Sequence, residues 1–360
     1  MKAGLSIRHE DEKIHFPIFR FKVSADMWSF LFVYYQGSWI GFFVILSFCH
    51  LIFLDLGWLV KLKKVLVTGA GGLMGDYVIR ELKDKFHLSG LDILPDKNGL
   101  PHIQDSILNV DAVKAACEGM DAIVQIAAIP NIWSGSGSEI IHTNVTGTWN
   151  VLRAAQEAGV KRIILTSSDS VIGYTVLSGA MIPPSYLPID HNHPPRPTDP
   201  YALSKKLCEE MAKSFVDDDA FEVVVMRPVF VLYPEFEAEV RARAADPKGY
   251  KGPVSSAGKP PGGGAMWHYV DPRDLAVAYR KALILEEPGF GPYFICGPTI
   301  LAPDETLKTL RDKTGVDIEV KDENIYELSP FAPLYDLTHA EINLGFKAVH
   351  DLREQYNLYG

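Results

Sequence analysis

Tyr201 and Lys205 are the residues of this chain whose types and spacing best suit proton and hydride chemistry. They lie four positions apart, so a helix opening at Asp199-Pro200 would present both on one face. A phenol has a pKa near ~10 and is a poor base at neutral pH, but a nearby ammonium group and the positive end of a helix favour the phenolate. An isolated Tyr-x-x-x-Lys is more often a tyrosine packed on a lysine stem, so the assignment needs support elsewhere.

Ser168 provides part of that support. It follows the aliphatic run Arg162–Thr166, which predicts a buried strand. We expect Ser168 to hydrogen-bond the hydroxyl oxygen that Tyr201 deprotonates while the adjacent carbon sends hydride to a nicotinamide. Lys205 would also hold the nicotinamide ribose. Ser168, Tyr201 and Lys205 are therefore the predicted catalytic residues.

A glycine-rich loop upstream supplies the rest. It joins a predicted buried strand, Lys63–Val67, to a helix expected from about Leu73 to Leu82. The first glycine permits a tight turn, the second lets the backbone approach a pyrophosphate, and the third allows close helix–strand packing. The helix N-terminus would offer unpaired N–H groups to the phosphates. The loop reads Thr68-Gly69-Ala70-Gly71-Gly72-Leu73-Met74-Gly75.

Asp92 ends the next predicted strand, Phe86–Leu91. A carboxylate there can accept hydrogen bonds from both adenosine ribose hydroxyls and would repel a 2′-phosphate. The nearest cation that follows is Lys97. NAD is therefore favoured over NADP as the cofactor.

Strand and helix patterns keep alternating beyond this point. Further strands are expected at Asp121–Ala128 and Phe221–Met226, with a helix between them from about Glu139 to Ala158. This alternation predicts an α/β fold, a Rossmann-type doubly wound parallel sheet with a smaller C-terminal substrate-binding lobe. Ligands bind such sheets at the carboxyl ends of the strands, where Asp92, Ser168 and Tyr201 all fall.

From about Lys61 to its C-terminus the chain resembles the extended short-chain dehydrogenase/reductases, specifically the NAD-dependent epimerase/dehydratase family. The resemblance is carried by the glycine loop, Asp92, Asp105, Ala127-Ala128, Asn144, Thr166–Gly173, Tyr201–Lys205, Arg227-Pro228 and His268–Asp271. It implies a homodimer that pairs through a four-helix bundle including the tyrosine-bearing helix. It implies cofactor contacts from Gly69, Gly71, Gly72, Leu73, Met74, Gly75, Asp92, Asp105, Ser106, Ala127, Ala128, Asn144, Tyr201, Lys205 and Pro228.

The expected function is that of an NAD-dependent epimerase or oxidoreductase acting on a hydroxyl of a sugar or nucleotide-sugar-like substrate. The segment Arg227–Pro234 lacks the Asn and Gly common in nucleotide-sugar epimerases, Gln125 replaces a His, and Ile172 replaces a Tyr. A sugar or uronate dehydrogenase that releases NADH and a non-catalytic NAD-binding redox sensor both stay open. Dehydration ranks lower, because Asp169 is followed by serine rather than glutamate.

We expect an NAD-binding domain over residues 61–230, and a mainly substrate-binding lobe over 231–360 with elements that return to the first domain. In that lobe a charged helix at 235–243 carries Arg241 and Arg243 as candidate anion contacts, and the loop at 259–264 is placed to close over a substrate. Asp271 is expected to cap a helix.

The composition excludes other classes. There are 45 acidic and 35 basic side chains, a formal net charge of -10, which argues against a nucleic-acid surface. The four cysteines at 49, 117, 208 and 296 lack metal or disulfide-framework spacing and fit a reducing, cytoplasmic compartment. His191 and His193 lie in a proline-rich loop without a carboxylate or cysteine cluster, so no metal is predicted.

Residues 1–60 lie outside the dehydrogenase pattern. From Trp28 to Leu54 there is no Asp, Glu, Lys or Arg, a run long enough to span a bilayer. Lysines at 61, 63 and 64 would keep the catalytic domain on the cytoplasmic side of such an anchor. The alternative is a mis-called start, with the natural protein beginning near Val60 or Leu62.

Overall fold

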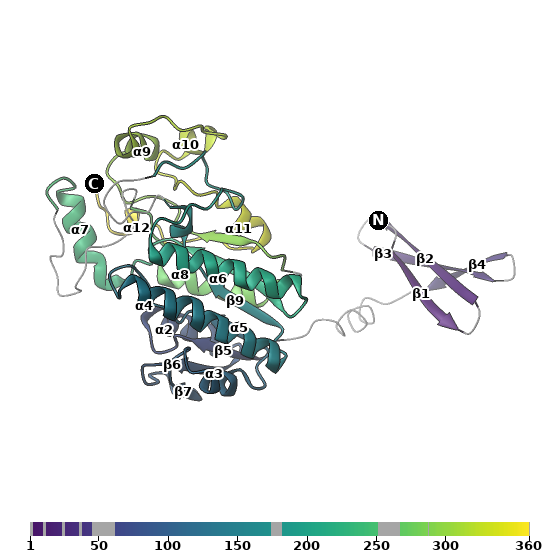
Figure 1. The fold of residues 1–360 in the computed structure, drawn as a ribbon. Coiled ribbons are helices and arrows are strands. Elements are labelled where there is room, and N and C mark those ends of the chain that lie inside the picture. Colours follow the sequence, from purple (N-terminus) through teal and green to yellow (C-terminus); the bar gives the residue numbers. More distant parts are fainter. Residues whose placement is uncertain are drawn as a thin grey trace. The chain divides into compact units, whose positions relative to one another are not determined.

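The computed structural model describes residues 62–173, 182–250, 267–286 and 288–359, together with the backbone of four strands between residues 3 and 44 (Figure 1). The chain forms two compact units, Met1–Lys61 and Leu62–Gly360.

The larger unit is built on a seven-stranded parallel sheet in the order β11-β10-β9-β8-β5-β6-β7. The chain runs outward from β5 in one direction and returns to β8 to continue in the other, so the order reverses between β5 and β8. Ligands bind doubly wound sheets at such a switch point. The predicted α/β fold class is therefore confirmed. The strands are β5 (Lys64–Thr68), β6 (His87–Asp92), β7 (His102–Gln104), β8 (Ala122–Gln125), β9 (Arg162–Thr166), β10 (Glu222–Pro228) and β11 (Pro292–Ile295).

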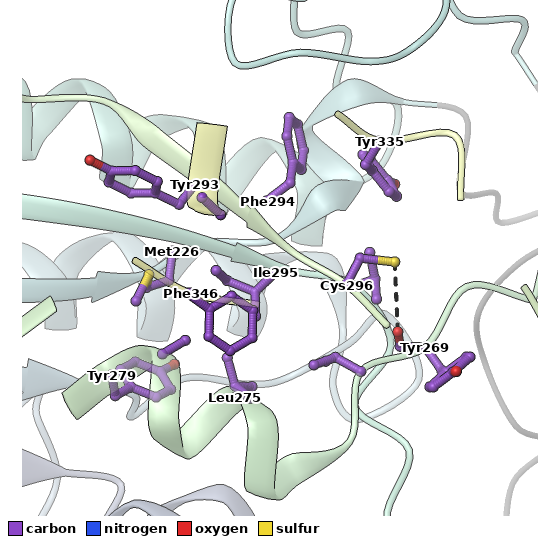
Figure 2. Packing of buried hydrophobic residues seen from close by; sticks show 14 of the residues in the cluster. Met226, Tyr269, Leu275, Tyr279, Tyr293, Phe294, Ile295, Cys296, Tyr335 and Phe346 are labelled. Atoms are coloured by element: carbon purple, nitrogen blue, oxygen red, sulfur yellow. Dashed lines mark hydrogen bonds between the residues drawn. The ribbon is translucent and has the colours of Figure 1, made fainter. Parts of the chain in front are cut away.

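Alternation along β5 separates two hydrophobic layers. Val65 and Val67 join a cluster with α2 (Leu73–Leu82) and α8 (Pro272–Leu283). Leu66 joins a second cluster on the other side of the sheet. That cluster includes residues of α3 (Val110–Cys117), α5 (Gly147–Ala158) and α6 (Pro200–Asp217). Figure 2 shows the first cluster where Met226 and Ile295 face Leu275 and Tyr279 of α8.

Smaller elements complete this unit. The helix expected from Glu139 to Ala158 is formed by α4 (Gly137–Ile141), the π-helical turn η1 (His142–Thr146) and α5. The charged helix expected at 235–243 is formed by α7 (Glu237–Ala245), which begins and ends two residues later. The predicted cap at Asp271 is confirmed, since its side chain accepts from the Arg273 N–H. The others are η2 (Asp169–Ile172), η3 (Pro234–Phe236), α7 (Glu237–Ala245), α9 (Thr306–Thr314), α10 (Asn324–Leu328), α11 (Thr338–Asn343) and α12 (Leu352–Gln355).

Two C-terminal segments pair with the loop that leads into α6. Leu187 forms a parallel bridge with Val320, and Ile189 forms one with Tyr335. Backbone bonds from Ile189 N to Leu334 O (2.7 Å) and from Asp336 N to Ile189 O (2.9 Å) hold the second bridge. The approach to Tyr201 is therefore fixed by residues more than a hundred positions downstream.

The smaller unit is an antiparallel sheet in the order β1-β2-β3-β4, with β1 (Ala3–His9), β2 (Glu12–Val23), β3 (Asp26–Tyr35) and β4 (Ser38–Val44). The expected membrane-spanning helix at residues 28–54 is wrong where β3 and β4 lie, and its remainder falls outside the described residues. The run is rich in aromatic and β-branched residues and is interrupted at Gly37, which favours a hairpin. Among the described residues, no helix combines the length and apolar character needed to cross a bilayer.

Candidate active site

The glycine loop turns directly from β5 into α2. Gly69 has φ +76°, a left-handed conformation that suits glycine. A Cβ on Gly75 would lie 2.2 Å from the Gly69 carbonyl oxygen, and a Cβ on Gly71 would lie 2.7 Å from Leu94 Cβ. Side chains at Gly71 and Gly75 would clash with the surrounding atoms. The backbone of the loop is therefore not covered by side chains at these positions, just before and within the first turn of α2.

The first turn of α2 and Asp92 fit a dinucleotide. Gly72 is the N-cap of α2 and provides no side-chain cap, which leaves the N–H groups of the first turn for a pyrophosphate. The Asp92 carboxylate, at the end of β6, accepts hydrogen bonds from Gly71 N (2.9 Å) and Leu94 N (2.8 Å). Lys97 Nζ donates to the Gly71 carbonyl (2.9 Å). Asp92 therefore both fixes the loop and lies where the adenosine ribose is expected.

The loop after β8 is tied to the glycine loop by residues whose role the sequence analysis did not foresee. Thr68 Oγ1 donates to Gln125 Oε1 and accepts from Ala127 N (3.2 Å). Gln125 Nε2 donates to the Ala127 carbonyl (3.2 Å). Gln125, where the family commonly has His, thus links two strands at the switch point and places Ala127 and Ala128 beside Gly69: a Cβ on Gly69 would lie 2.9 Å from Ala127 N.

Asn144 connects this loop to α6. Its Oδ1 accepts from Ile129 N (2.7 Å), and its Nδ2 donates to Ile129 O (3.1 Å) and to Ser204 Oγ (2.9 Å). Asn144 lies in the π-turn η1 and is 1% exposed. A π-turn often marks a functional site. Here it brings the amide of Asn144 between the cofactor loop and the tyrosine helix.

Asp105, Ser106 and Pro228 flank the same edge of the sheet. The Asp105 carboxylate accepts from Ser106 N (2.7 Å) and Asn109 Nδ2 (2.8 Å) just after β7. Pro228 is the last residue of β10. Their contacts with a cofactor remain predictions.

Ser168, Tyr201 and Lys205 come together at the end of β9. Asp199 Oδ1 caps α6 by accepting from Ala202 N (2.8 Å), and Pro200 opens the helix, so Tyr201 stands in its first turn. Lys205 Nζ lies 5.7 Å from the centre of the Tyr201 ring and donates to Thr166 O (2.9 Å). Ser168 lies near the Tyr201 phenol and acts to lower its pKa.

Burial shifts both ionisable members of this trio toward their neutral forms. Desolvation raises the pKa of Tyr201, the hydrogen bond with Ser168 opposes that shift, and the charges of Asp169 and Asp199 reinforce it. Desolvation also lowers the pKa of Lys205. Desolvation of the buried phenol thus acts against the lowered tyrosine pKa that the sequence predicts.

A buried ion pair that the sequence analysis missed lies one turn further along α6. Glu209 accepts from Arg227 Nε (2.8 Å) and Nη2 (2.7 Å), and also from Ser167 Oγ (2.6 Å). Glu209 and Arg227 are 5% and 4% exposed. Glu209 continues the four-residue spacing of Tyr201 and Lys205, which places it on the same helix face but does not identify Arg227 as its partner.

Other candidates are held by the protein itself. His193 accepts from Ser185 N (2.9 Å), and the His191 ring stacks on His339 at 4.0 Å. Arg241 donates to Tyr356 O (2.7 Å), and the Arg243 guanidinium lies 3.8 Å from the centre of the Trp267 ring. The anion role of these arginines stays a prediction, and the loop at 259–264 lies outside the described residues.

The fold brings the glycine loop and the Ser–Tyr–Lys trio to one edge of a parallel sheet, an arrangement that suits a dinucleotide. The chain belongs to the NAD dependent epimerase/dehydratase family, whose model matches residues 65–290. The cofactor of this family is NAD, as expected.

Curated relatives include sugar dehydrogenases. The chain is 30% identical over 171 residues to a uronate dehydrogenase of Pseudomonas syringae pv. tomato, a match covering 46% of this chain and 58% of that protein. It is 26% identical to an L-arabinose 1-dehydrogenase (NAD(P)(+)) of Haloferax volcanii, over 61% of this chain and 82% of that protein. The chain thus spans little more than half the length of the uronate dehydrogenases it matches.

Solved structures share the fold. A short-chain dehydrogenase/reductase superfamily protein from Agrobacterium tumefaciens with bound NAD aligns with a TM-score of 0.60 at 23% identity, over 82% of this chain and 97% of that chain. The UDP-glucose 4-epimerase of Thermotoga maritima aligns with a TM-score of 0.59 at 20% identity, over the same shares.

Proposed function

We propose that this protein uses NAD to oxidise a hydroxyl of a sugar or sugar acid, with Tyr201 as the proton acceptor. The observation that carries the proposal is the convergence of Ser168, Tyr201 and Lys205 at the carboxyl end of β9, on the same edge of the sheet as the glycine loop. The uronate and L-arabinose dehydrogenases among its relatives support a sugar carbinol as the substrate.

Each residue of the trio has a distinct task in this reaction. NAD, when bound, supplies the hydride acceptor. Ser168 Oγ donates a hydrogen bond to the reacting hydroxyl oxygen and orients it. Tyr201 reacts as the phenolate after its own proton has passed to solvent, and the phenolate oxygen takes the proton of the substrate hydroxyl. The Lys205 ammonium, anchored on the Thr166 carbonyl, stabilises this phenolate.

The test is the variant Tyr201→Phe, which keeps the ring and removes the oxygen that moves the proton. Turnover should fall by about 10²–10⁴-fold, the usual contribution of a general base, while NAD affinity stays within about twofold. Tyr356→Phe is the matched control, because it keeps the ring that packs against Arg241 and should leave turnover unchanged. Full turnover in Tyr201→Phe would refute the assignment.

The reaction outcome is decided by incubating the full chain with NAD and a panel of glucuronate, galacturonate, L-arabinose and UDP-glucose. NADH absorbance and sugar products are followed together. Accumulating NADH is the expected result. An isomerised sugar without net NADH would make the protein an epimerase instead, and binding of NAD without any turnover would support the redox-sensor alternative.

We also propose that the protein is a homodimer paired through α5 and α6. Three large apolar side chains on these helices face outward: Trp149 on α5 and Leu203 and Leu207 on α6 are 45%, 42% and 38% exposed. Leu203 and Leu207 lie one turn apart on the same face. A second copy that packed its own α5 and α6 on this surface would bury these three side chains in both copies, because a two-fold symmetric interface uses the same surface on each.

A further inference from the structure

Asp169 is a buried carboxylic acid to which the proposed reaction gives no task. It follows Ser168 directly, opens η2 and is 7% exposed. Its Oδ1 accepts a hydrogen bond from Ser168 Oγ (3.2 Å), and its Oδ2 accepts one from the Tyr335 hydroxyl (2.7 Å). Within the described parts of the chain its partners are hydroxyl and backbone N–H groups, so no cation pairs with it there.

Tyr335 is held firmly in the position from which it donates. Its backbone pairs with Ile189, in the loop that leads to the catalytic helix. Its ring stacks on Phe294 with 4.7 Å between ring centres, and the His268 ring lies 4.9 Å away (Figure 2 shows Tyr335 and Phe294 on adjoining segments). The Asp169–Tyr335 hydrogen bond therefore joins the C-terminal part of the chain to the residue beside Ser168.

Asp169 faces ionisable groups from three directions. Tyr201 approaches from α6, Tyr335 from the C-terminal segment, and Cys296 from the end of β11. The charge of Asp169 raises the pKa of both Tyr201 and Cys296. His268, beyond Tyr335, stays neutral because burial lowers its pKa to about 3.

The charge of Asp169 is itself adjustable near neutral pH. Burial raises the pKa of its carboxyl to about 6, and the hydrogen bonds from Tyr335 and Ser168 act in the opposite direction. Below that pH the protonated form dominates, and above it the carboxylate dominates. Because the Ser168 hydroxyl has one proton, it donates either to an ionised Asp169 or to the oxygen of another group.

We propose that Asp169, held by Tyr335, is a positioning residue that acts through Ser168 and Tyr201. When ionised, Asp169 draws the Ser168 proton to itself and favours the protonated Tyr201 phenol. When protonated, it leaves the Ser168 proton to the reacting hydroxyl and favours Tyr201 as the base of the proposed reaction. The proposal rests on the proposed roles of Ser168 and Tyr201 in the reaction, but its main test needs no turnover.

That test follows the ionisation of Asp169 from Tyr201. The full chain, isotopically labelled at tyrosine Cζ and loaded with NAD, is titrated by NMR, and the Tyr201 signal is identified by its loss in Tyr201→Phe. In the wild type this signal should show an inflection near pH 6 as Asp169 changes charge. Asp169→Asn should abolish the inflection, while Asp217→Asn, at an exposed position on α6, should leave it in place.

Tyr335→Phe provides an independent variant that keeps the ring stacking. Loss of the donated hydrogen bond should move the inflection to higher pH, because that bond lowers the pKa of Asp169. An inflection that persists in Asp169→Asn, or one that is absent from the wild type, would overturn the proposal. Turnover by Tyr201→Phe would overturn the proposed function instead, so the two failures are distinguishable.

Discussion

Tyr201 and Lys205 lie as close together as their four-residue spacing predicts, yet their acidities depend on their surroundings in the fold. The spacing is a local property of a helix, so the sequence was enough to place both residues on one face. The extent of desolvation depends on segments from the whole chain that cover the two side chains. Burial consequently raises the pKa of Tyr201, whereas the neighbouring charge and the helix terminus alone predict a lowered value.

Asp92 provides a prediction on cofactor choice. Asp92→Ala removes the acceptor of the Gly71 and Leu94 N–H groups as well as the negative charge near the expected ribose. We expect NAD affinity to fall by about 10- to 100-fold, as for lost hydrogen bonds to a charged group, and the preference for NAD over NADP to shrink. Calorimetry with both cofactors measures this. Asp84→Ala, at an exposed site, should bind as the wild type does; an equally unaffected Asp92→Ala would contradict the assignment.

Some residues near the site were beyond the reach of sequence reasoning. Ser168, Tyr201 and Lys205 belong to short motifs, and each motif is local. The partner of Asp169 is Tyr335, 166 positions away, and nothing in the sequence around either residue indicates that they meet. The sequence therefore predicts which residues lie at the site more readily than it predicts the hydrogen bonds that shift their pKa values.

Among the elements, α6 holds two of the three predicted catalytic residues. Its N-terminal turn holds Tyr201, its second turn Lys205 and its third Glu209, all on the face that looks onto the ends of β9 and β10. The Glu209–Arg227 pair fixes the helix to β10, one helical turn beyond Lys205. Burial lowers the pKa of Lys205, and the negative charge of Glu209 acts in the opposite direction. The helix is thus anchored by charge at one point and by its Asp199 cap at another.

This anchoring gives a prediction on stability. Glu209→Ala leaves a buried Arg227 without its counter-charge and should lower the free energy of unfolding by about 3–5 kcal/mol, measured by chemical denaturation. Replacing both partners, Glu209→Leu with Arg227→Met, should restore most of that loss. Glu210→Ala, which removes an exposed ion pair on the same helix, should change stability by less than about 1 kcal/mol. If Glu209→Ala and Glu210→Ala lowered the free energy of unfolding by similar amounts, the buried pair would contribute no more to stability than the exposed one.

Elements with strong local patterns were predicted well. The aliphatic runs became β5, β6, β8, β9 and β10, and the Asp-Pro start of α6 is where the sequence places it. The short edge strands β7 and β11 were missed, because three or four residues carry too little periodicity. The apolar N-terminal run was assigned by hydropathy to a helix, although its aromatic and β-branched content favours the strands β3 and β4.

At the scale of the whole molecule, the proposed dimer is testable through its apolar surface. Leu203→Glu combined with Leu207→Glu places two charges on the outward face of α6 and should convert the dimer to a monomer in sedimentation measurements. Lys213→Glu, an exposed substitution further along α6, is the control and should stay dimeric. A wild type that sediments as a monomer would exclude this pairing.

The parallel sheet and its switch point were predictable because each strand and each helix has a recognisable local sequence pattern, and these patterns alternate along the chain. The C-terminal part was not, because its contribution is non-local. Leu187 and Ile189 pair with residues around Val320 and Tyr335, and neither partner belongs to a regular strand with a recognisable pattern. Such pairings depend on the completed sheet and on the loops that surround it.

These two bridges have a consequence for the growing polypeptide. When a ribosome has finished β11, every strand of the sheet and every member of the Ser–Tyr–Lys trio has been made. The loop that delivers Tyr201 still lacks both of the segments that hold it, and Asp169 still lacks Tyr335. A nascent chain therefore completes the strands of its parallel sheet before it has made the segments that hold the loop in front of Tyr201, so this part of the proposed site is the last to be assembled.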